Sequence, residues 1–243
     1  MPEASGASRG GPLIAVLGYH KVGPHPIEWW TWFYVGEETF ARQLEWLRTA
    51  GWEIIGLDRF LRGLEYPAAL GERSAIITFD DGYRSLREGA FRRLRQLEAP
   101  AVVFVATDYI GGVNSFDQDV EPIEAMCDWG DLERLWRAGF SIQSHTASHA
   151  ALSALSPERR EEELVRSKAV LEARLSQRVT ALSYPYGDDG GDRDSVDRLL
   201  SRTGYRAAFL YGGGAVTASA IDGFRIPRLA MGPDTDLARE LRF

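Results

Sequence analysis

The chain has 243 residues, 44% of them hydrophobic and 26% charged, which is the composition of a folded soluble domain able to bury a substantial core. Its net charge of −7 argues against sequence-independent nucleic-acid binding, which requires clustered Lys and Arg. Its single cysteine, Cys127, excludes an internal disulfide. We therefore expect no nucleic-acid partner, and the oligomeric state stays open.

The N-terminal residues 1–11 are rich in Gly and Ser and have neither the basic start nor the long apolar run of a secretory signal. We expect a flexible tail there, followed by one folded domain at 12–243. The apolar stretch at 12–18 is too short for a membrane span, which needs about 20 residues. These features predict a cytoplasmic protein, unless a signal was removed from the chain as printed.

Short β-rich runs alternate with helical patterns, which is typical of a parallel α/β fold. The expected strands are 13–17, 53–56, 74–79, 101–105, 140–144, 180–184, 207–210 and 224–226. The expected helices are 38–50, 85–97, 132–138, 157–175 and 193–203. Ser156 and Pro157 mark the start of the longest helix, and Gly51, Gly139 and Gly204 follow helical runs as left-handed C-caps do.

The repeated β/α units fit either a closed barrel or an open doubly wound sheet. No Gly-rich dinucleotide turn follows the first strand, so the sequence favours the barrel. Barrel enzymes assemble their sites from residues that follow the carboxyl ends of several strands. Three polar groupings in this chain have that placement.

The first grouping is Asp80 and Asp81, which end the strand at 74–79 and precede Gly82. Consecutive residues at a strand end point in different directions, so one carboxylate can bind a metal while the other remains available as a base. An isolated Asp-Asp-Gly is more commonly a helix cap and a turn. The two carboxylates therefore indicate a catalytic site only in combination with the other groupings.

The second grouping is His145 and His149, after the strand at 140–144. On one helical turn, two imidazoles four residues apart lie on the same side, a spacing used for zinc. Such a pair also occurs by chance on solvated helices. Together with the strand-ending carboxylates, it favours a metal site.

The third grouping is Pro185, Tyr186 and Gly187, after the strand at 180–184. A Pro–aromatic–Gly turn exposes backbone N–H groups at a rigid place, as an oxyanion site requires. Taken alone, this segment is more simply explained as an ordinary tight turn.

Segments 78–83, 144–149 and 184–187 resemble the three motifs of the polysaccharide deacetylases, carbohydrate esterases with a NodB homology domain. Weaker similarity at 18–22 and 224–228 extends the resemblance over most of the chain. Within the family, the chain most resembles the poly-N-acetylglucosamine deacetylase-like branch. It implies a distorted (β/α) TIM-like barrel that removes an N-acetyl group from an N-acetylated amino sugar or glycan.

The resemblance also implies a role for each motif residue. Asp81, His145 and His149 would bind one divalent metal ion, Asp80 would act as general base, and the backbone N–H of Tyr186 would face the oxyanion. Zinc suits two imidazoles and a carboxylate, and iron, cobalt and nickel remain alternatives.

One departure from the family pattern concerns the base. Many relatives carry an Arg ahead of the Pro–aromatic–Gly turn, where this chain has Ser183 and Tyr184. We hypothesise that Arg228, after the last expected strand, holds Asp80 ionised instead; Arg225 is the alternative.

A second departure concerns the general acid. Relatives commonly use a C-terminal His, but no His follows His149 in this chain. In the poly-N-acetylglucosamine branch that His is permuted to an N-terminal Tyr-His segment. This predicts His20 as the general acid, although a buried structural His at a strand end is the simpler alternative.

Two other functions stay open. One is hydrolysis of an amide or imide, or deformylation, of a small non-polymeric substrate. The other is an inactive carbohydrate-binding barrel, which the retention of both carboxylates and both histidines disfavours.

Overall fold

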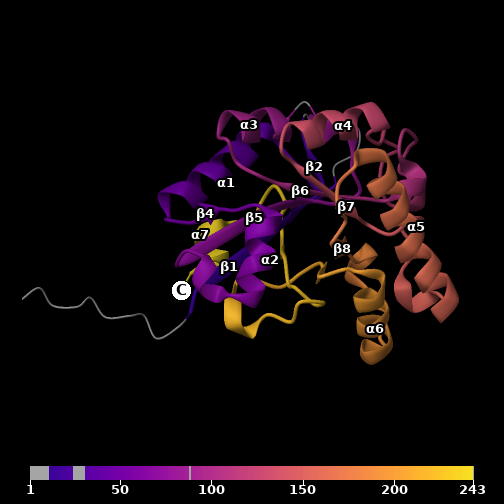
Figure 1. The fold of residues 1–243 in the computed structure, drawn as a ribbon. Coiled ribbons are helices and arrows are strands. Elements are labelled where there is room, and N and C mark those ends of the chain that lie inside the picture. The colour runs from indigo at the N-terminus through magenta and orange to yellow at the C-terminus, as the bar shows by residue number, and fades with distance from the viewer. Residues whose placement is uncertain (1–10, 24–30, 88, 243) are drawn as a thin grey trace, which may run out of the picture.

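The computed structural model describes residues 11–23, 31–87 and 89–242 (Figure 1). The tail expected at 1–11 therefore lies, except for Gly11, outside the described residues. Within the described ranges, the main sheet has nine strands, and a smaller sheet pairs β2 (Lys21–Val22) with β3 (Tyr34–Val35). The main-sheet strands are β1 (Leu13–Tyr19), β4 (Glu53–Ile54), β5 (Arg73–Phe79), β6 (Val102–Val105), β7 (Ser141–Ser144), β8 (Ala181–Ser183), β9 (Ala207–Phe209), β10 (Val216–Thr217) and β11 (Leu229–Ala230).

The main sheet curls into a barrel-like shape. Its strands follow the order β10-β1-β5-β6-β7-β8-β9, and the pairs from β1 to β9 along this path are parallel. The chain after residue 224 links the two ends, because Ile226 bridges to Phe209 of β9 while β11 pairs with β1. The preference for a (β/α) barrel over an open sheet is confirmed.

The strand expected at 224–226 is wrong. Only Ile226 makes a bridge, and the regular pairing occurs further on, in β11. Pro227 has no N–H to donate to a ladder, so it interrupts pairing between the two positions. As a result Arg228 lies on the segment that closes the barrel.

Helices surround the curved sheet (Figure 1), and α2 (Leu57–Glu65) contributes Phe60 to the core inside the barrel. They are α1 (Glu37–Thr49), α2 (Leu57–Glu65), α3 (Ala90–Gln96), α4 (Trp129–Arg137), α5 (Pro157–Leu175), α6 (Arg193–Thr203) and the short α7 (Leu237–Glu240). The expected bounds of α5 and α6 are confirmed. The helix expected at 85–97 is instead a 3-10 turn at Arg84–Arg87 followed by α3, and α2 was not expected.

Local sequence explains the ends of α5. Ser156 accepts a hydrogen bond from the N–H of Arg159, and Pro157 occupies the first turn, where no intrahelical donor is needed. The helix ends at Leu175, and the residue that follows, Ser176, has a left-handed conformation. Its buried face includes Glu163, Ser167 and Leu171, which follow one another at intervals of four residues. This face packs toward β7, where Ser167 hydrogen-bonds Ser144 at 2.8 Å.

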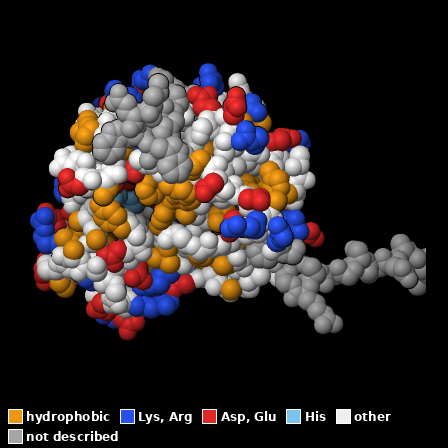
Figure 2. All heavy atoms as spheres, turned by 180° about the vertical axis from the view of Figure 1, so that it is seen from behind, with side chains coloured by type: hydrophobic (Ala, Val, Ile, Leu, Met, Phe, Trp, Pro, Cys, Tyr) orange, Lys and Arg blue, Asp and Glu red, His pale blue; other side chains and the backbone are white. Residues whose placement is uncertain are grey.

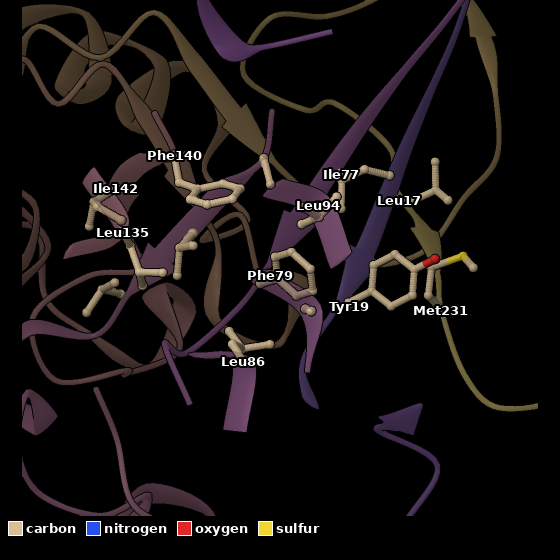
Figure 3. Close-up of a cluster of buried hydrophobic side chains, with 14 of the residues drawn as sticks. Leu17, Tyr19, Ile77, Phe79, Leu86, Leu94, Leu135, Phe140, Ile142 and Met231 are labelled. Atoms are coloured by element: carbon tan, nitrogen blue, oxygen red, sulfur yellow. The ribbon is translucent and has the colours of Figure 1, made fainter. Parts of the chain in front are cut away.

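Alternate residues of the strands serve two cores. Inside the barrel, Ile14, Ile76 and Phe104 pack with Phe60 of α2. Facing outward, the next residues along the same strands pack under the helices; Figure 3 shows Leu17, Tyr19, Ile77 and Phe79 with Leu94 and Leu135. This period of two is that of strands buried on both faces. Among the described helices, none combines the length and apolar character that crossing a bilayer requires.

Candidate active site

A cavity of about 170 Å³ lies beyond the carboxyl ends of the strands. A histidine is visible in a hollow on this face, with hydrophobic side chains beside it (Figure 2). The cavity brings together six of the seven predicted site residues, and Arg228 lies buried against one of them. The six are His20, Asp80, Asp81, His145, His149 and Tyr186.

Arg228 forms a bidentate ion pair with Asp80. Its Nη1 donates to Asp80 Oδ1 at 2.8 Å and its Nη2 to Asp80 Oδ2 at 2.5 Å. The other guanidinium donors reach the hydroxyls of Thr78 (3.2 Å) and Ser183 (2.8 Å) and the carbonyl of Leu210 (2.6 Å). All five N–H donors of a fully buried guanidinium therefore have acceptors.

This pairing decides the charge of Asp80. Burial alone would raise the pKa of its carboxyl, but the Arg228 guanidinium and then His145 outweigh burial and hold the pKa below its ordinary value. Because the guanidinium of Arg228 is rigid and binds both oxygens, it also fixes the orientation of the Asp80 carboxylate. The structure thus places Arg228, rather than Arg225, beside Asp80; Arg225 instead pairs with Asp189 and Asp197.

Asp81, His145 and His149 converge on one point. Their ligand atoms lie within 4.8 Å of one another, and Asp81 Oδ1 is 3.3 Å from His145 Nε2 and 3.2 Å from His149 Nε2. His145 Nδ1 is 2.8 Å from the carbonyl oxygen of Ser183, which only accepts, so Nδ1 carries a proton and Nε2 is the nitrogen left to bind a metal.

A divalent cation fits this group. Asp81 Oδ1 is buried and accepts no hydrogen bond of acceptable geometry among the described residues. One carboxylate oxygen and two imidazole nitrogens that face one another suit a divalent cation. The charges around the site also favour a cation. Burial disfavours charge on His145, but Asp80 and Asp81 outweigh burial and raise the pKa of that imidazole.

The expected helical turn at 145–149 is wrong. The segment is irregular, and Thr146 and His149 have left-handed φ angles of 63° and 60°. Asp81 (68°) and Tyr186 (59°) share this conformation, so four of the six such non-glycine residues in the described chain lie at the site. Such conformations cost about 1–3 kcal/mol each and persist only where surrounding contacts fix them.

Glu163 on α5 supplies such contacts and was missed by sequence reasoning. Its buried carboxylate accepts hydrogen bonds from the N–H groups of Ala147 (2.9 Å) and Ser148 (2.7 Å) and from the Ser148 hydroxyl (2.8 Å). The loop is thereby closed around Glu163, which brings His145 and His149 together without a helix. A Glu on the buried face of an otherwise charged helix was the one local signal.

His20 lies at the end of β1, between the rings of Phe33 (4.6 Å) and Tyr211 (5.1 Å). Its Nδ1 is buried and has no hydrogen-bond partner among the described residues. Burial lowers its pKa, which Asp81 and Asp80 partly oppose. His20 therefore lines the cavity with an Nδ1 that has no partner in the described part of the chain, unlike Nδ1 of His145.

Comparison with known proteins finds relatives that match most of the chain. The Bacillus subtilis protein YxkH is 24% identical over 193 residues, which are 79% of this chain and 62% of YxkH, so the chain spans less than two thirds of that relative. The poly-β-1,6-N-acetyl-D-glucosamine N-deacetylase of Staphylococcus epidermidis is 25% identical over 211 residues, 83% of this chain and 69% of that protein.

Solved structures share the fold. The Streptococcus pyogenes deacetylase PplD, in complex with acetate, superposes with a TM-score of 0.81 at 21% identity, covering 96% of this chain and 99% of PplD. IcaB from Ammonifex degensii gives 0.74 at 22% identity over 93% of both chains.

The family model described as polysaccharide deacetylase matches residues 68–208. The match covers more than half of the chain and runs from just before β5 to β9, so it contains all three sequence motifs. The chain belongs to the polysaccharide deacetylase family.

Proposed function

We propose that this protein hydrolyses the N-acetyl amide of N-acetylglucosamine units in a glycan, releasing acetate and a free amine. One observation carries the proposal: an Arg228-held carboxylate and a convergent Asp–His–His group share one small cavity. The named activity of the Staphylococcus epidermidis relative supports this substrate class.

Asp81, His145 and His149 would hold the metal ion. A divalent cation there would polarise the acetyl carbonyl and acidify a neighbouring water. Zinc fits two imidazoles and a carboxylate, as do iron, cobalt and nickel.

The chain's own residues would move the protons. Asp80, kept ionised by Arg228, accepts a proton from the attacking water as its oxygen bonds to the carbonyl carbon. The backbone N–H of Tyr186 donates to the oxyanion that forms. His20, in its protonated form, delivers a proton to the amide nitrogen as the C–N bond breaks, so that a neutral amine leaves.

The charges that line the cavity favour a sugar without acidic groups. Lys21 pairs with Glu121 at 2.6 Å and Glu124 at 3.3 Å, and Arg228 is saturated by Asp80 and its neighbours. Among the described lining residues, no Lys or Arg is therefore left to bind a carboxylate or phosphate on the substrate, while Asp117 adds negative charge. A neutral N-acetylglucosamine polymer meets no repulsion here.

The test is acetate release from N-acetylglucosamine oligomers by metal-reconstituted protein, with Asp80→Asn as the matched control. Acetate release that falls by about 10²-fold or more in the control supports the proposal. No acetate from the oligomers, with one equivalent of metal bound, would refute it and direct attention to small amides and imides.

A further inference from the structure

The two histidines of the site are supported in different ways. His145 Nδ1 donates to a main-chain carbonyl at the end of β8, which the sheet holds in place. His149 Nδ1 instead lies 3.1 Å from the Tyr186 hydroxyl, whose oxygen lies 3.2 Å from Asp117 Oδ1. The ring of Phe116 stacks on His149 with centroids 4.0 Å apart. His149 therefore depends on side chains from two loops.

The direction of these hydrogen bonds follows from their chemistry. An ionised Asp117 can only accept, so the Tyr186 hydroxyl donates to it. The lone pairs of Tyr186 Oη are then free to accept from His149 Nδ1–H. With the proton on Nδ1, Nε2 of His149 presents a lone pair toward Asp81 Oδ1, 3.2 Å away. The relay thus selects the tautomer that can bind a cation.

The loop that carries Asp117 is itself fixed. The buried side chain of Asn114 donates to the Pro122 carbonyl at 2.9 Å and accepts from the N–H of Glu124 at 2.6 Å. The ion pair of Lys21 and Glu121, both almost fully buried, ties the far end of the loop to the segment that follows His20. Asp117 therefore meets Tyr186 from an anchored backbone.

We propose that Tyr186 and Asp117 are positioning residues that fix the tautomer and orientation of His149 for metal binding. The proposal rests on the proposed function, in which His149 is a metal ligand. It gives the Tyr186 side chain a role separate from that of its backbone N–H. Loss of such an outer partner of a metal-binding His typically weakens metal affinity about 10- to 100-fold.

A second tyrosine of the cavity provides a matched control for Tyr186. Tyr211 lines the same cavity, but its buried hydroxyl has no hydrogen-bond partner among the described residues. Tyr211→Phe removes the same atom as Tyr186→Phe without touching the relay. Tyr186 is 59% exposed, so loss of its hydroxyl leaves the fold intact, which circular dichroism of the metal-free variants verifies.

The experiment titrates the metal-free full chain with Zn²⁺ against a competing chromophoric chelator, and with Co²⁺ to record the visible absorption of the bound ion. Tyr186→Phe should weaken Zn²⁺ binding about 10- to 100-fold and change the Co²⁺ spectrum, whereas Tyr211→Phe should stay within about twofold of the wild type. Asp117→Asn should weaken binding less. Because the relay acts as a unit, Tyr186→Phe/Asp117→Asn should bind no more weakly than Tyr186→Phe alone.

Two results would overturn the inference, and only the second would also overturn the proposed function. If Tyr186→Phe binds Zn²⁺ as tightly as the wild type while His149→Ala does not bind, the relay has no positioning role and the proposed function stands. If the wild type itself binds neither Zn²⁺ nor Co²⁺, the inference and the proposed function both fail.

Discussion

The ion pair of Arg228 and Asp80 gives the sharpest test of how this site is built. The two residues are 148 positions apart in the sequence and both are buried, so Arg228 also attaches the closing segment of the barrel to β5. Replacing Arg228 with Met keeps a long side chain but leaves the Asp80 carboxylate buried without its counter-charge. Removing one partner of a buried pair typically lowers the free energy of unfolding by about 3–5 kcal/mol.

For a chain of this length, each kcal/mol shifts the melting temperature by about 2–4 °C, so Arg228→Met should melt about 6–20 °C lower. The assay is thermal and urea unfolding, in the presence of chelator, of four proteins: wild type, Asp80→Asn, Arg228→Met and the double variant. The double variant contains no unpaired buried charge. Its loss of unfolding free energy should therefore be smaller than the sum of the losses in the two single variants by about 2 kcal/mol or more.

Arg225→Met is the matched control. Arg225 also pairs with several carboxylates, but those of Asp189, Asp197 and Asp222 are about one third exposed and water can solvate them. Its loss should lower the free energy of unfolding by only about 1 kcal/mol. Single losses at Asp80 and Arg228 that add to within about 0.5 kcal/mol would refute the argument, because independent sites behave that way.

Three further predictions concern proton transfer, loop closure and substrate charge. His20→Ala should lower kcat for acetate release by about 10²- to 10⁴-fold while the bound metal, measured by elemental analysis, stays at the wild-type level; loss of metal would make His20 a ligand instead. Glu163→Gln should lower the free energy of unfolding by about 1.5–3 kcal/mol and weaken Zn²⁺ binding, because a neutral amide loses the charge-assisted hydrogen bonds to the two loop N–H groups and cannot accept from the Ser148 hydroxyl with its NH2 group. Glu162→Gln, on the exposed face of the same helix, should change stability by less than about 0.5 kcal/mol, and equal effects of the two substitutions would contradict the role of Glu163. Oligomers of N-acetylglucosamine should have a kcat/KM at least about tenfold above that of oligomers containing the carboxylate sugar N-acetylmuramic acid; an equal or reversed preference would show that the charge argument is wrong.

Much of the fold follows from local sequence. The cap at Ser156, the Pro at 157 and the left-handed Gly204 are properties of a few adjacent residues, so the bounds of α5 and α6 could be predicted. The buried strand that ends in Asp80 and Asp81 has the continuous apolar character of a parallel strand covered on both faces. Since parallel strands end at the same edge of a sheet, the strand-ending motifs could be expected to meet in one cavity, and they do.

The precise geometry of the site depends on long-range contacts that local patterns do not encode. The spacing of His145 and His149 suggested a helical turn, but hydrogen bonds to Glu163 stabilise a strained loop that no residue of the segment prefers by itself. The sequence determined which side chains carry the chemistry, because residue type and position after a strand are local properties. Only the tertiary structure decided that Arg228 holds Asp80 and that Tyr186 supports His149, because both contacts require the barrel to close first.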